Sequence, residues 1–273
     1  MNITAYKQHL IENEKSAATV EKYMRDITAF MVWLNGRELD KGTVLEYKER
    51  LITSYAPRSV NSIISSLNSY FDYLGRHDCK VKTLKIQQQI FTEKEKELTK
   101  AEYERLLNAA KRQGNERLYL LMQTVCSTGI RISELKHITA EAVKNGTAHI
   151  SCKGKMRTIF LPKLLCKMLK RYMKARNIKS GAVFITKSGR PLDRSNIWSE
   201  MKRAADSAGV ASSKVFPHNL RHLFARTYYA IKKDIVRLAD ILGHASINTT
   251  RIYTMESGEV HRRHIEQMHL LLC

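Results

Sequence analysis

The chain has 273 residues, and its 47 Lys and Arg against 26 Asp and Glu give a formal net charge of +21 at pH 7. This length fits one large domain or two modest ones, and a hydrophobic fraction of 43% is that of a folded, soluble protein. The excess of positive charge favours a polyanionic partner, nucleic acid before an anionic membrane. The sequence contains neither a membrane-length apolar run nor the apolar core of a signal peptide, so we expect no membrane partner.

Five cysteines occur without a C-x-x-C pair. Such a set is typical of reduced thiols in a cytoplasmic protein, and of neither a disulfide framework nor a zinc site. We therefore expect a cytoplasmic protein without a bound metal.

The first 75 or so residues carry apolar side chains at the three- and four-residue spacing of amphipathic helices. Helices are predicted over 3–13, 19–35, 41–53 and 57–74. Pro57 suits the first turn of the last helix, and Gly75 ends it. Four helices of this length can close a small bundle.

Residues 79–98 interrupt the pattern with a sequence rich in Lys, Gln and Glu. We interpret them as a linker between an N-terminal domain of residues 1–78 and a C-terminal domain of residues 99–273. The alternative is a surface loop within one domain. A helix restarts at Thr99, which forms a capping box with Glu102.

The second half is also mainly helical, with one β-like interruption. Residues 148–152 and 157–161 are strand-like runs that flank Lys153-Gly154-Lys155-Met156 and predict a hairpin. Helices are predicted over 162–177, 193–208, 217–232, 235–242 and 259–272.

Common catalytic signatures are missing from the chain. It has no G-x-x-x-x-G-K-[ST] loop, no G-x-G-x-x-G, no H-E-x-x-H and no G-x-S-x-G. These absences disfavour an ATP-driven motor and a dinucleotide enzyme.

Four motifs in the second half instead contain cationic and hydrogen-bonding side chains. They are TGIRISEL at 128–135, HNLRH at 218–222, LGHAS at 242–246 and TTRIYT at 249–254. Arg131 follows a glycine turn at a helix start, and His218 and Arg221 share one face of a helix whose N-terminus favours anions. His244 follows a helix-ending glycine, and Tyr253 lies nine residues beyond it. Each motif alone has an ordinary structural explanation, but their order and spacing together point to chemistry.

In that order and at those separations, with SCKGKMRTIFLP at 151–162 between them, the motifs resemble the tyrosine recombinase (phage integrase) family and its Xer-type members. The resemblance implies a mainly α fold: an N-terminal four-helix SAM-like DNA-binding domain, then a mainly α catalytic domain with a small β-hairpin (the DNA breaking-rejoining enzyme fold). It also implies a site-specific recombinase that uses no cofactor and works in association with the nucleoid.

By this resemblance Tyr253 is the nucleophile that forms a 3′-phosphotyrosine and frees a 5′-hydroxyl. Arg131 and Arg221 would hold the phosphate through bidentate hydrogen bonds, and His218 and His244 would add donors or handle the proton of the nucleophile. The two arginines are expected to lower the pKa of Tyr253. The hairpin lysine that protonates the leaving oxygen is Lys153, with Lys155 as the alternative.

Other residues near the motifs are expected to play supporting roles. Glu134 braces Arg131 or packs the helix end, while His222, Lys155 and Arg226 support the site or contact DNA. Residues 55–58 (YAPR) and 187–194 (KSGRPLDR) are candidates for contact with bases, although most basic residues contact the DNA backbone.

The expected partner is double-stranded DNA at specific recombination sites, with an affinity that falls steeply as salt rises. By the resemblance, the C-terminal segment 259–273 is exchanged between protomers of a homotetramer on DNA, whereas the free protein is a monomer or weak oligomer. The segment could equally pack on its own domain.

Two other functions compete with recombination. One is a noncatalytic DNA-binding accessory protein or repressor with the same fold, which the complete set of catalytic residue types disfavours. The other is relaxation of supercoils of the type IB topoisomerase kind, which the compact N-terminal helical domain and the C-terminal helix disfavour.

Overall fold

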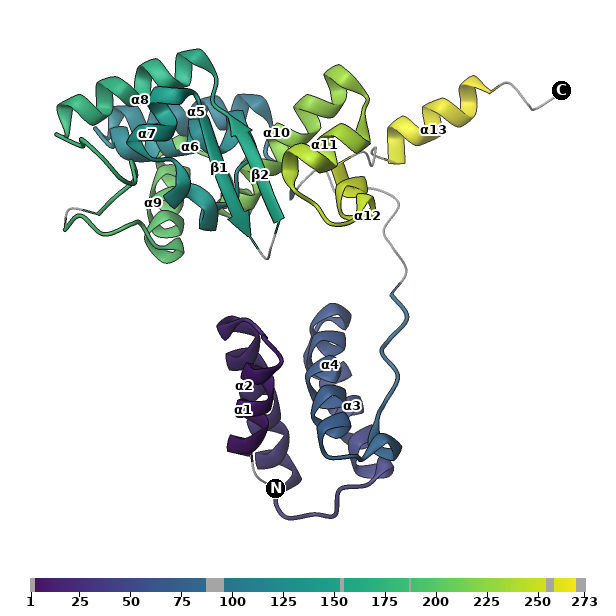
Figure 1. Cartoon of the computed structure of the whole chain (residues 1–273). Coiled ribbons are helices and arrows are strands. Elements are labelled where there is room, and N and C mark those ends of the chain that lie inside the picture. Colours follow the sequence, from purple (N-terminus) through teal and green to yellow (C-terminus); the bar gives the residue numbers. More distant parts are fainter. Residues whose placement is uncertain (1–2, 87–95, 153–154, 187, 254–257, 269–273) are drawn as a thin grey trace, which may run out of the picture. The chain divides into compact units, whose positions relative to one another are not determined.

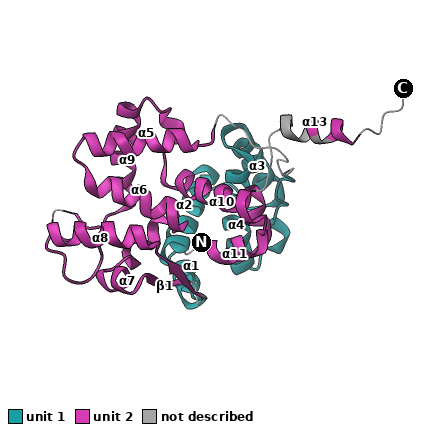
Figure 2. Cartoon of the chain, turned by 90° about the horizontal axis from the view of Figure 1, so that it is seen from above, with its two compact units in different colours: residues 1–88 teal, residues 89–273 magenta. Residues whose placement is uncertain are grey.

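The computed structural model describes residues 3–86, 96–152, 155–186, 188–253 and 258–268 (Figure 1). The chain divides into two compact units, residues 1–88 and 89–273, which Figure 2 colours separately. Each unit has a hydrophobic core of its own. Within the described residues, no helix is both long enough and apolar enough to cross a membrane.

The N-terminal unit consists of the four helices predicted from the sequence, with boundaries close to the expected ones. They are α1 (Ile3–Glu12), α2 (Ala17–Leu34), α3 (Lys41–Ser54) and α4 (Pro57–Tyr73), followed by the short 3-10 helix η1 (His77–Cys79). The side chains of Ser16 and Asp40 cap the first turns of α2 and α3. Phe30 of α2 and Phe71 of α4 are fully buried in the core between the helices.

The segment after η1 belongs to the N-terminal unit rather than to a linker. Asn68 of α4 accepts from the backbone N–H of Val81 at 3.0 Å and donates to its carbonyl at 2.9 Å. Asn61, two turns earlier, holds Leu84 in the same way at 2.7 and 2.9 Å. At the other end, Leu98 is fully buried in the core of the C-terminal unit. Both ends of the predicted linker therefore pack on the units that they join.

The C-terminal unit is mainly helical, as predicted. Its helices are α5 (Lys100–Arg112), α6 (Glu116–Thr128), η3 (Ile132–His137), α7 (Ala140–Asn145), α8 (Lys163–Ala175), α9 (Arg194–Ala208), η4 (Ser212–Lys214), α10 (Pro217–Lys232), α11 (Ile235–Leu242), α12 (Ile247–Thr250), η5 (Arg251–Tyr253) and α13 (Gly258–Gln267). The capping box of Thr99 and Glu102 opens α5 as expected. The predicted helix 259–272 corresponds to α13, and its last residues lie outside the described part of the chain.

The predicted hairpin is present. Strand β1 (Thr147–Cys152) pairs antiparallel with β2 (Lys155–Phe160), so that Thr147 faces Phe160 and Cys152 faces Lys155. Apolar residues of both strands, among them Ile150 and Ile159, enter the core of the unit. The hairpin therefore has one anchored face, which fixes its register against the helices.

Two glycines end helices where other parts of the unit come close. Gly129 (φ +66) ends α6, and a Cβ there would lie 2.5 Å from the ring of Phe224 on α10. Gly243 (φ +62) ends α11, and a Cβ there would lie 2.7 Å from Cδ of Arg157 on β2. Both turns require a residue that tolerates positive φ and that has no side chain.

Candidate active site

The structure brings together most of the site residues expected from the sequence. Arg131 precedes η3, and His218 and Arg221 lie in the first two turns of α10, which packs against α6. His244 follows the C-terminal glycine of α11, and Tyr253 ends η5. The position of the hairpin lysine relative to these residues is not described, because Lys153 and the side chain of Lys155 lie outside the described residues.

Arg221 is a buried cation, with only 1% of its surface exposed. Its guanidinium donates from NH1 to the carbonyl of Gly129 at 2.6 Å, and from NH2 to the carbonyl of Leu242 at 2.7 Å and to Nε2 of His244 at 2.9 Å. Its buried Nε has no hydrogen-bond partner among the described residues. Burial, then the charge of Arg131, lowers the pKa of Arg221 to about 10, so it stays charged at neutral pH.

Arg131 is held by Glu134, as the sequence analysis expected. The Arg131 guanidinium donates to Glu134 Oε1 at 2.9 Å, and its backbone N–H donates to Oε2 at 2.8 Å. A third bond runs from Arg131 NH2 to the carbonyl of Gly243 at 3.1 Å. Burial opposes ionisation of Glu134, but the Arg131 hydrogen bonds and the Arg157 charge lower its pKa overall, so the carboxylate is ionised.

Tyr253 is buried beside these groups, with 4% of its surface exposed. Its ring centroid lies 4.8 Å from that of His222, edge to face, and 6.0 Å from that of His244, nearly parallel. The expectation of a lowered pKa is wrong for the free protein. Burial raises the pKa of Tyr253 by more than the charges of Arg221 and Arg131 lower it. The phenol is therefore protonated at neutral pH.

The three histidines of the site are neutral at pH 7. Burial first, then the Arg221 charge, lowers the pKa of His244 to about 4, and burial lowers that of His222 to about 3. Partial desolvation and the charges of Arg221, Arg131 and Arg194 also lower the pKa of His218. Since a guanidinium can only donate, His244 Nε2 is the acceptor of the Arg221 bond, and Nδ1–H donates to Thr250 Oγ1 at 2.8 Å.

A cavity of about 820 Å³ opens in front of the arginines. Arg131, His218 and Arg221 line it together with Arg194, Trp198 and Lys202 of α9. The lining therefore combines several donors of positive charge with an indole that is half exposed. An anionic ligand with flat, apolar parts, such as a nucleotide unit, suits a cavity of this chemistry.

Sequence reasoning missed two neighbours of the site. Arg157 on β2 forms an ion pair with Glu134 and donates to the carbonyl of Ile241 at 2.6 Å. Thr250 orients His244. Both residues lie inside quoted motifs, at 151–162 and 249–254, but the sequence analysis gave neither a role. Arg226, by contrast, pairs with Glu97 and with the carbonyl of Leu98, so it anchors the start of the unit.

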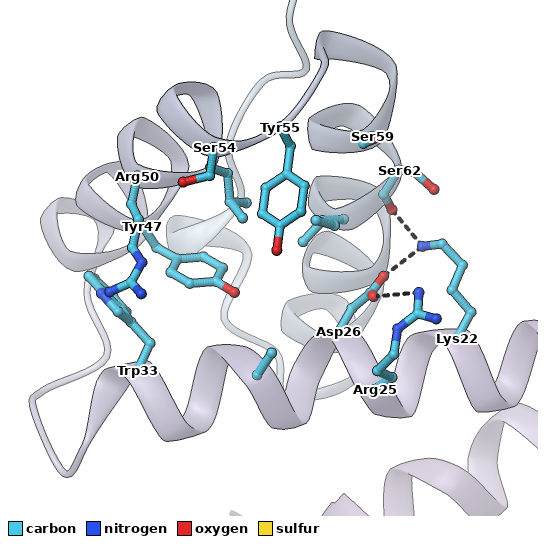
Figure 3. Close-up of a pocket in the computed structure, with 13 residues that line it drawn as sticks. Lys22, Arg25, Asp26, Trp33, Tyr47, Arg50, Ser54, Tyr55, Ser59 and Ser62 are labelled. Carbon is cyan, nitrogen blue, oxygen red and sulfur yellow. Dashed lines mark hydrogen bonds and ion pairs between the residues drawn. The ribbon is translucent and has the colours of Figure 1, made fainter. Parts of the chain in front are cut away.

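The N-terminal unit has a basic pocket of its own, about 590 Å³ in volume, between α2, α3 and α4 (Figure 3). At one end, the carboxylate of Asp26 accepts from Lys22 at 2.6 Å and from Ser66 at 2.8 Å. Arg50 lies at the other end with aromatic side chains. Tyr55, from the predicted base-contacting segment, lines this pocket as well.

The mainly helical C-terminal unit thus places two guanidinium groups, neutral imidazoles and one phenol close together. Comparison with known proteins identifies the class of protein. Residues 96–259 match the phage integrase family, and residues 3–78 match the phage integrase N-terminal SAM-like domain. The chain belongs to the phage integrase family and is a tyrosine-type site-specific recombinase.

Similar proteins cover nearly the whole chain. Tyrosine recombinase XerA of Thermococcus kodakarensis is 28% identical over 280 residues, which span 98% of this chain and 95% of that protein. Tyrosine recombinase XerD of Listeria monocytogenes is 30% identical over 270 residues, 90% of each chain. The crystal structure of a lambda integrase tetramer bound to a Holliday junction shares the fold, with a TM-score of 0.70 and 19% identity over 92% of this chain and 75% of that one. The predicted mainly α fold is confirmed.

Proposed function

We propose that Tyr253 attacks a phosphodiester of double-stranded DNA at a specific site, and that Arg131, Arg221, His218 and His244 hold the reacting phosphate. The observation that carries this proposal is the buried charge of Arg221. Its hydrogen-bond partners are two carbonyls and a neutral imidazole. A buried cation is costly without a counter-ion, and a phosphate in the neighbouring cavity would supply one. It would also satisfy the free Nε–H of this side chain.

The reaction exchanges one phosphoester for another. The phenol oxygen of Tyr253 forms a bond to phosphorus while the bond from phosphorus to the 5′-oxygen breaks. The products are a 3′-phosphotyrosine and a free 5′-hydroxyl, and attack by a 5′-hydroxyl reverses the step. The energy of the phosphoester is retained in the protein, so neither ATP nor a metal or other cofactor is required. Guanidinium groups aimed at the non-bridging oxygens would each contribute on the order of 10²–10³ in rate.

Two protons move in this step. The phenol proton must leave Tyr253, whose raised pKa keeps it bound at neutral pH, and the neutral imidazole of His218 is able to accept it. The His244 ring can accept it only after its Nε2 is released from the hydrogen bond with Arg221. The leaving 5′-oxygen needs a proton, which we assign to the hairpin lysine, Lys153 or alternatively Lys155. Strand β2, which begins at Lys155, contacts the site through Arg157, which forms an ion pair with Glu134.

Burial of the nucleophile adds a requirement. Because Tyr253 is only 4% exposed, its ring has to become accessible before it can reach a phosphate in the cavity. Tyr253 ends a short 3-10 helix that follows the four-residue helix α12. Such short elements rearrange at lower cost than long ones.

The remaining basic surfaces fit DNA binding. We assign the N-terminal unit to gripping the duplex, with Lys22, Arg25 and Arg50 of its pocket in contact with the phosphate backbone. Arg194 and Lys202 would hold phosphates that flank the reacting one. Arg194 is also the last residue of the segment 187–194 that the sequence predicts to contact bases.

On DNA we expect a homotetramer, in which the C-terminal segment 259–273 is exchanged between protomers, while the free protein is a monomer or weak oligomer. Support comes from the tetramer that lambda integrase forms on a Holliday junction. In solution without DNA, sedimentation should give a mass close to one or two chains. With a Holliday junction it should give four chains.

A covalent trapping assay tests the proposal. The protein is incubated with a nicked suicide duplex that carries a recombination site, and DNA–protein adducts are separated by denaturing electrophoresis. The wild type should form an adduct that survives EDTA and leaves a 5′-hydroxyl open to labelling by a kinase. Tyr253→Phe should form none, whereas Tyr228→Phe, a matched change on α10 beside the same aromatic cluster, should retain it.

Other outcomes would favour the competing functions. No adduct with any site would leave a noncatalytic DNA-binding protein. An adduct with relaxation of plasmids that lack the site would indicate a topoisomerase. An adduct that persists in Tyr253→Phe would contradict the assignment of the nucleophile.

A further inference from the structure

Arg157 connects three segments of the C-terminal unit that are far apart in the sequence. It lies on β2, close to the hairpin turn, and its side chain is 13% exposed. One end of its guanidinium pairs with Oε2 of Glu134, in the Arg131 segment, and NH1 donates to the carbonyl of Ile241 near the end of α11 at 2.6 Å. A single side chain thus touches the hairpin, the first arginine motif and the helix that leads to His244.

The side chain also packs against the turn that follows α11. A Cβ on Gly243 would lie 2.7 Å from Cδ and 3.1 Å from Nε of Arg157. The backbone of this turn gives its Gly243 carbonyl to Arg131 and continues into His244. The shape of the turn and the position of Arg157 therefore depend on each other.

The charged side chains of Arg131, Glu134 and Arg157 contact one another in that order. Glu134 accepts from the guanidinium of Arg131 through Oε1 and pairs with Arg157 through Oε2. One carboxylate between two guanidinium groups leaves a net charge of +1. Without Arg157, Glu134 would cancel the charge that Arg131 offers to a phosphate.

We propose that Arg157 is a positioning residue: it locks the Arg131–Glu134 pair and the Gly243–His244 turn to the β-hairpin, and it balances the Glu134 charge so that Arg131 stays available to the phosphate. The proposal rests on the proposed function. Arg157 lies in the segment 151–162 that carries the resemblance, but the sequence analysis gave it no role. A lysine could replace the charge but not the two-ended contact, because an ammonium lacks the planar fork.

The test compares Arg157→Met and Arg157→Lys with the wild type in single-turnover cleavage of the suicide duplex. Arg171→Met, which removes an exposed arginine from α8 of the same unit, is the matched control. Arg157→Met should cleave about 100-fold more slowly, the effect of misplacing a reacting group by about 1 Å. Arg157→Lys should recover part of this loss. The dissociation constant for DNA should change less than about threefold in both, since a side chain buried this far contributes little to phosphate contacts.

The titration of His244 is a readout that a merely structural residue would leave unchanged. The charged and titratable groups that face this ring are Arg221, Arg131, Arg157, His218 and Tyr253. Loss of the Arg157 charge should raise the pKa of His244 above about 4, while burial and the charges of Arg221 and Arg131 keep it below its ordinary value, as followed by NMR of the ring. Arg157→Lys should restore the low value.

A second pair of variants moves Arg157 without removing it. Gly243 and Gly209 both end helices with positive φ, +62 and +59, so alanine is similarly strained at each. Only at Gly243 does the new methyl group meet Arg157, because a Cβ at Gly209 has nothing within 4 Å. Gly243→Ala should therefore lower the cleavage rate at least about tenfold more than Gly209→Ala.

Cleavage by Arg157→Met within about threefold of the wild type would overturn the inference. So would a parallel fall of melting temperature, DNA affinity and cleavage in both Arg157 variants, which would indicate a structural role only. If the wild type forms no adduct that depends on Tyr253, the proposed function itself fails, and that result is distinct from either of these.

Discussion

Both units of the protein bury charged side chains, and Asp26 of the N-terminal unit and Arg221 of the C-terminal unit have opposite surroundings. In the N-terminal unit, the carboxylate of Asp26, 6% exposed, accepts hydrogen bonds from the positively charged side chains of Lys22 and Arg25 (Figure 3). The hydroxyl of Ser66 donates to the same carboxylate. In the C-terminal unit, the guanidinium of Arg221, 1% exposed, meets two carbonyls and a neutral histidine.

The contrast indicates that the charge of Asp26 has a structural role and that the charge of Arg221 has a functional one. A buried charge that only holds a fold is matched by its opposite, because an unmatched one is costly. Arg221 keeps its charge next to a cavity that also contains Arg131 and His218. The protein tolerates this arrangement because DNA brings the missing anion. Changes at Arg221 should therefore alter catalysis far more than stability, and changes at Asp26 should do the reverse.

The largest effect is expected from Arg221→Lys. The ammonium keeps the charge but cannot donate to Gly129, Leu242 and a phosphate at once, so single-turnover cleavage should fall on the order of 10³-fold. The melting temperature should change by only a few degrees. Wild-type cleavage in this variant would contradict the comparison.

Arg131→Lys should have the second-largest effect on cleavage. Its positive charge remains, so the affinity for DNA should be kept, but the fork that faces the phosphate is lost and cleavage should fall on the order of 10²-fold. The two quantities are measured on the same duplex by fluorescence anisotropy and adduct formation. Equal losses of binding and cleavage would show that Arg131 is merely a DNA contact.

Asp26→Ala should affect stability and leave the chemistry intact. Lys22 and Ser66 lose their shared acceptor, so denaturant unfolding should report a loss of about 2 kcal/mol. Asp72→Ala, which removes an exposed ion pair with Lys80 in the same unit, is the control and should cost much less. If both variants were equally stable, the Asp26 network would have no structural role. Adduct formation measured at saturating DNA should be close to that of the wild type.

The last expected effect is a dependence of stability on pH. The folded pKa values of His244 and His222, about 4 and 3, lie below the ordinary value of 6.5. Between these values the unfolded chain binds more protons than the folded one, so stability should fall as the pH drops from about 6.5 toward 4. Urea midpoints at pH 7.5 and 5 measure the change, which should be smaller in His222→Phe. A free protein that becomes more stable over this range would contradict the burial of neutral imidazoles beside the arginines.

Much of the fold and of the site was accessible from the sequence, because helices follow from local spacing and caps. The apolar period of residues 57–74 and the capping box at Thr99 both predicted what the structure has. The order of the motifs likewise indicated which side chains would meet. Arg157 was missed because its partners, Glu134 and Ile241, come from distant segments that only the packed hairpin brings near.

The net shift in the pKa of Tyr253 was predicted in the wrong direction because burial, like the contacts of Arg157, appears only in the folded unit. The sequence shows which charges accompany the phenol, and these do lower its pKa. Burial among Leu238, Leu242 and Ala225 is a property of the folded unit, and it has the larger effect. Asn61 and Asn68 likewise hold Leu84 and Val81 by hydrogen bonds that the sequence alone does not show.

The most direct measurement is the position of the DNA on the trapped protein. Trypsin cuts after Arg251 and Arg262, so the peptide of residues 252–262 contains a single tyrosine, Tyr253. Mass spectrometry of the adduct, after nuclease digestion, should find the residual 3′-phosphonucleotide on this peptide and fragment ions that place it on the tyrosine. A nucleotide on any other peptide, or an adduct that forms when Tyr253 is phenylalanine, would contradict the account.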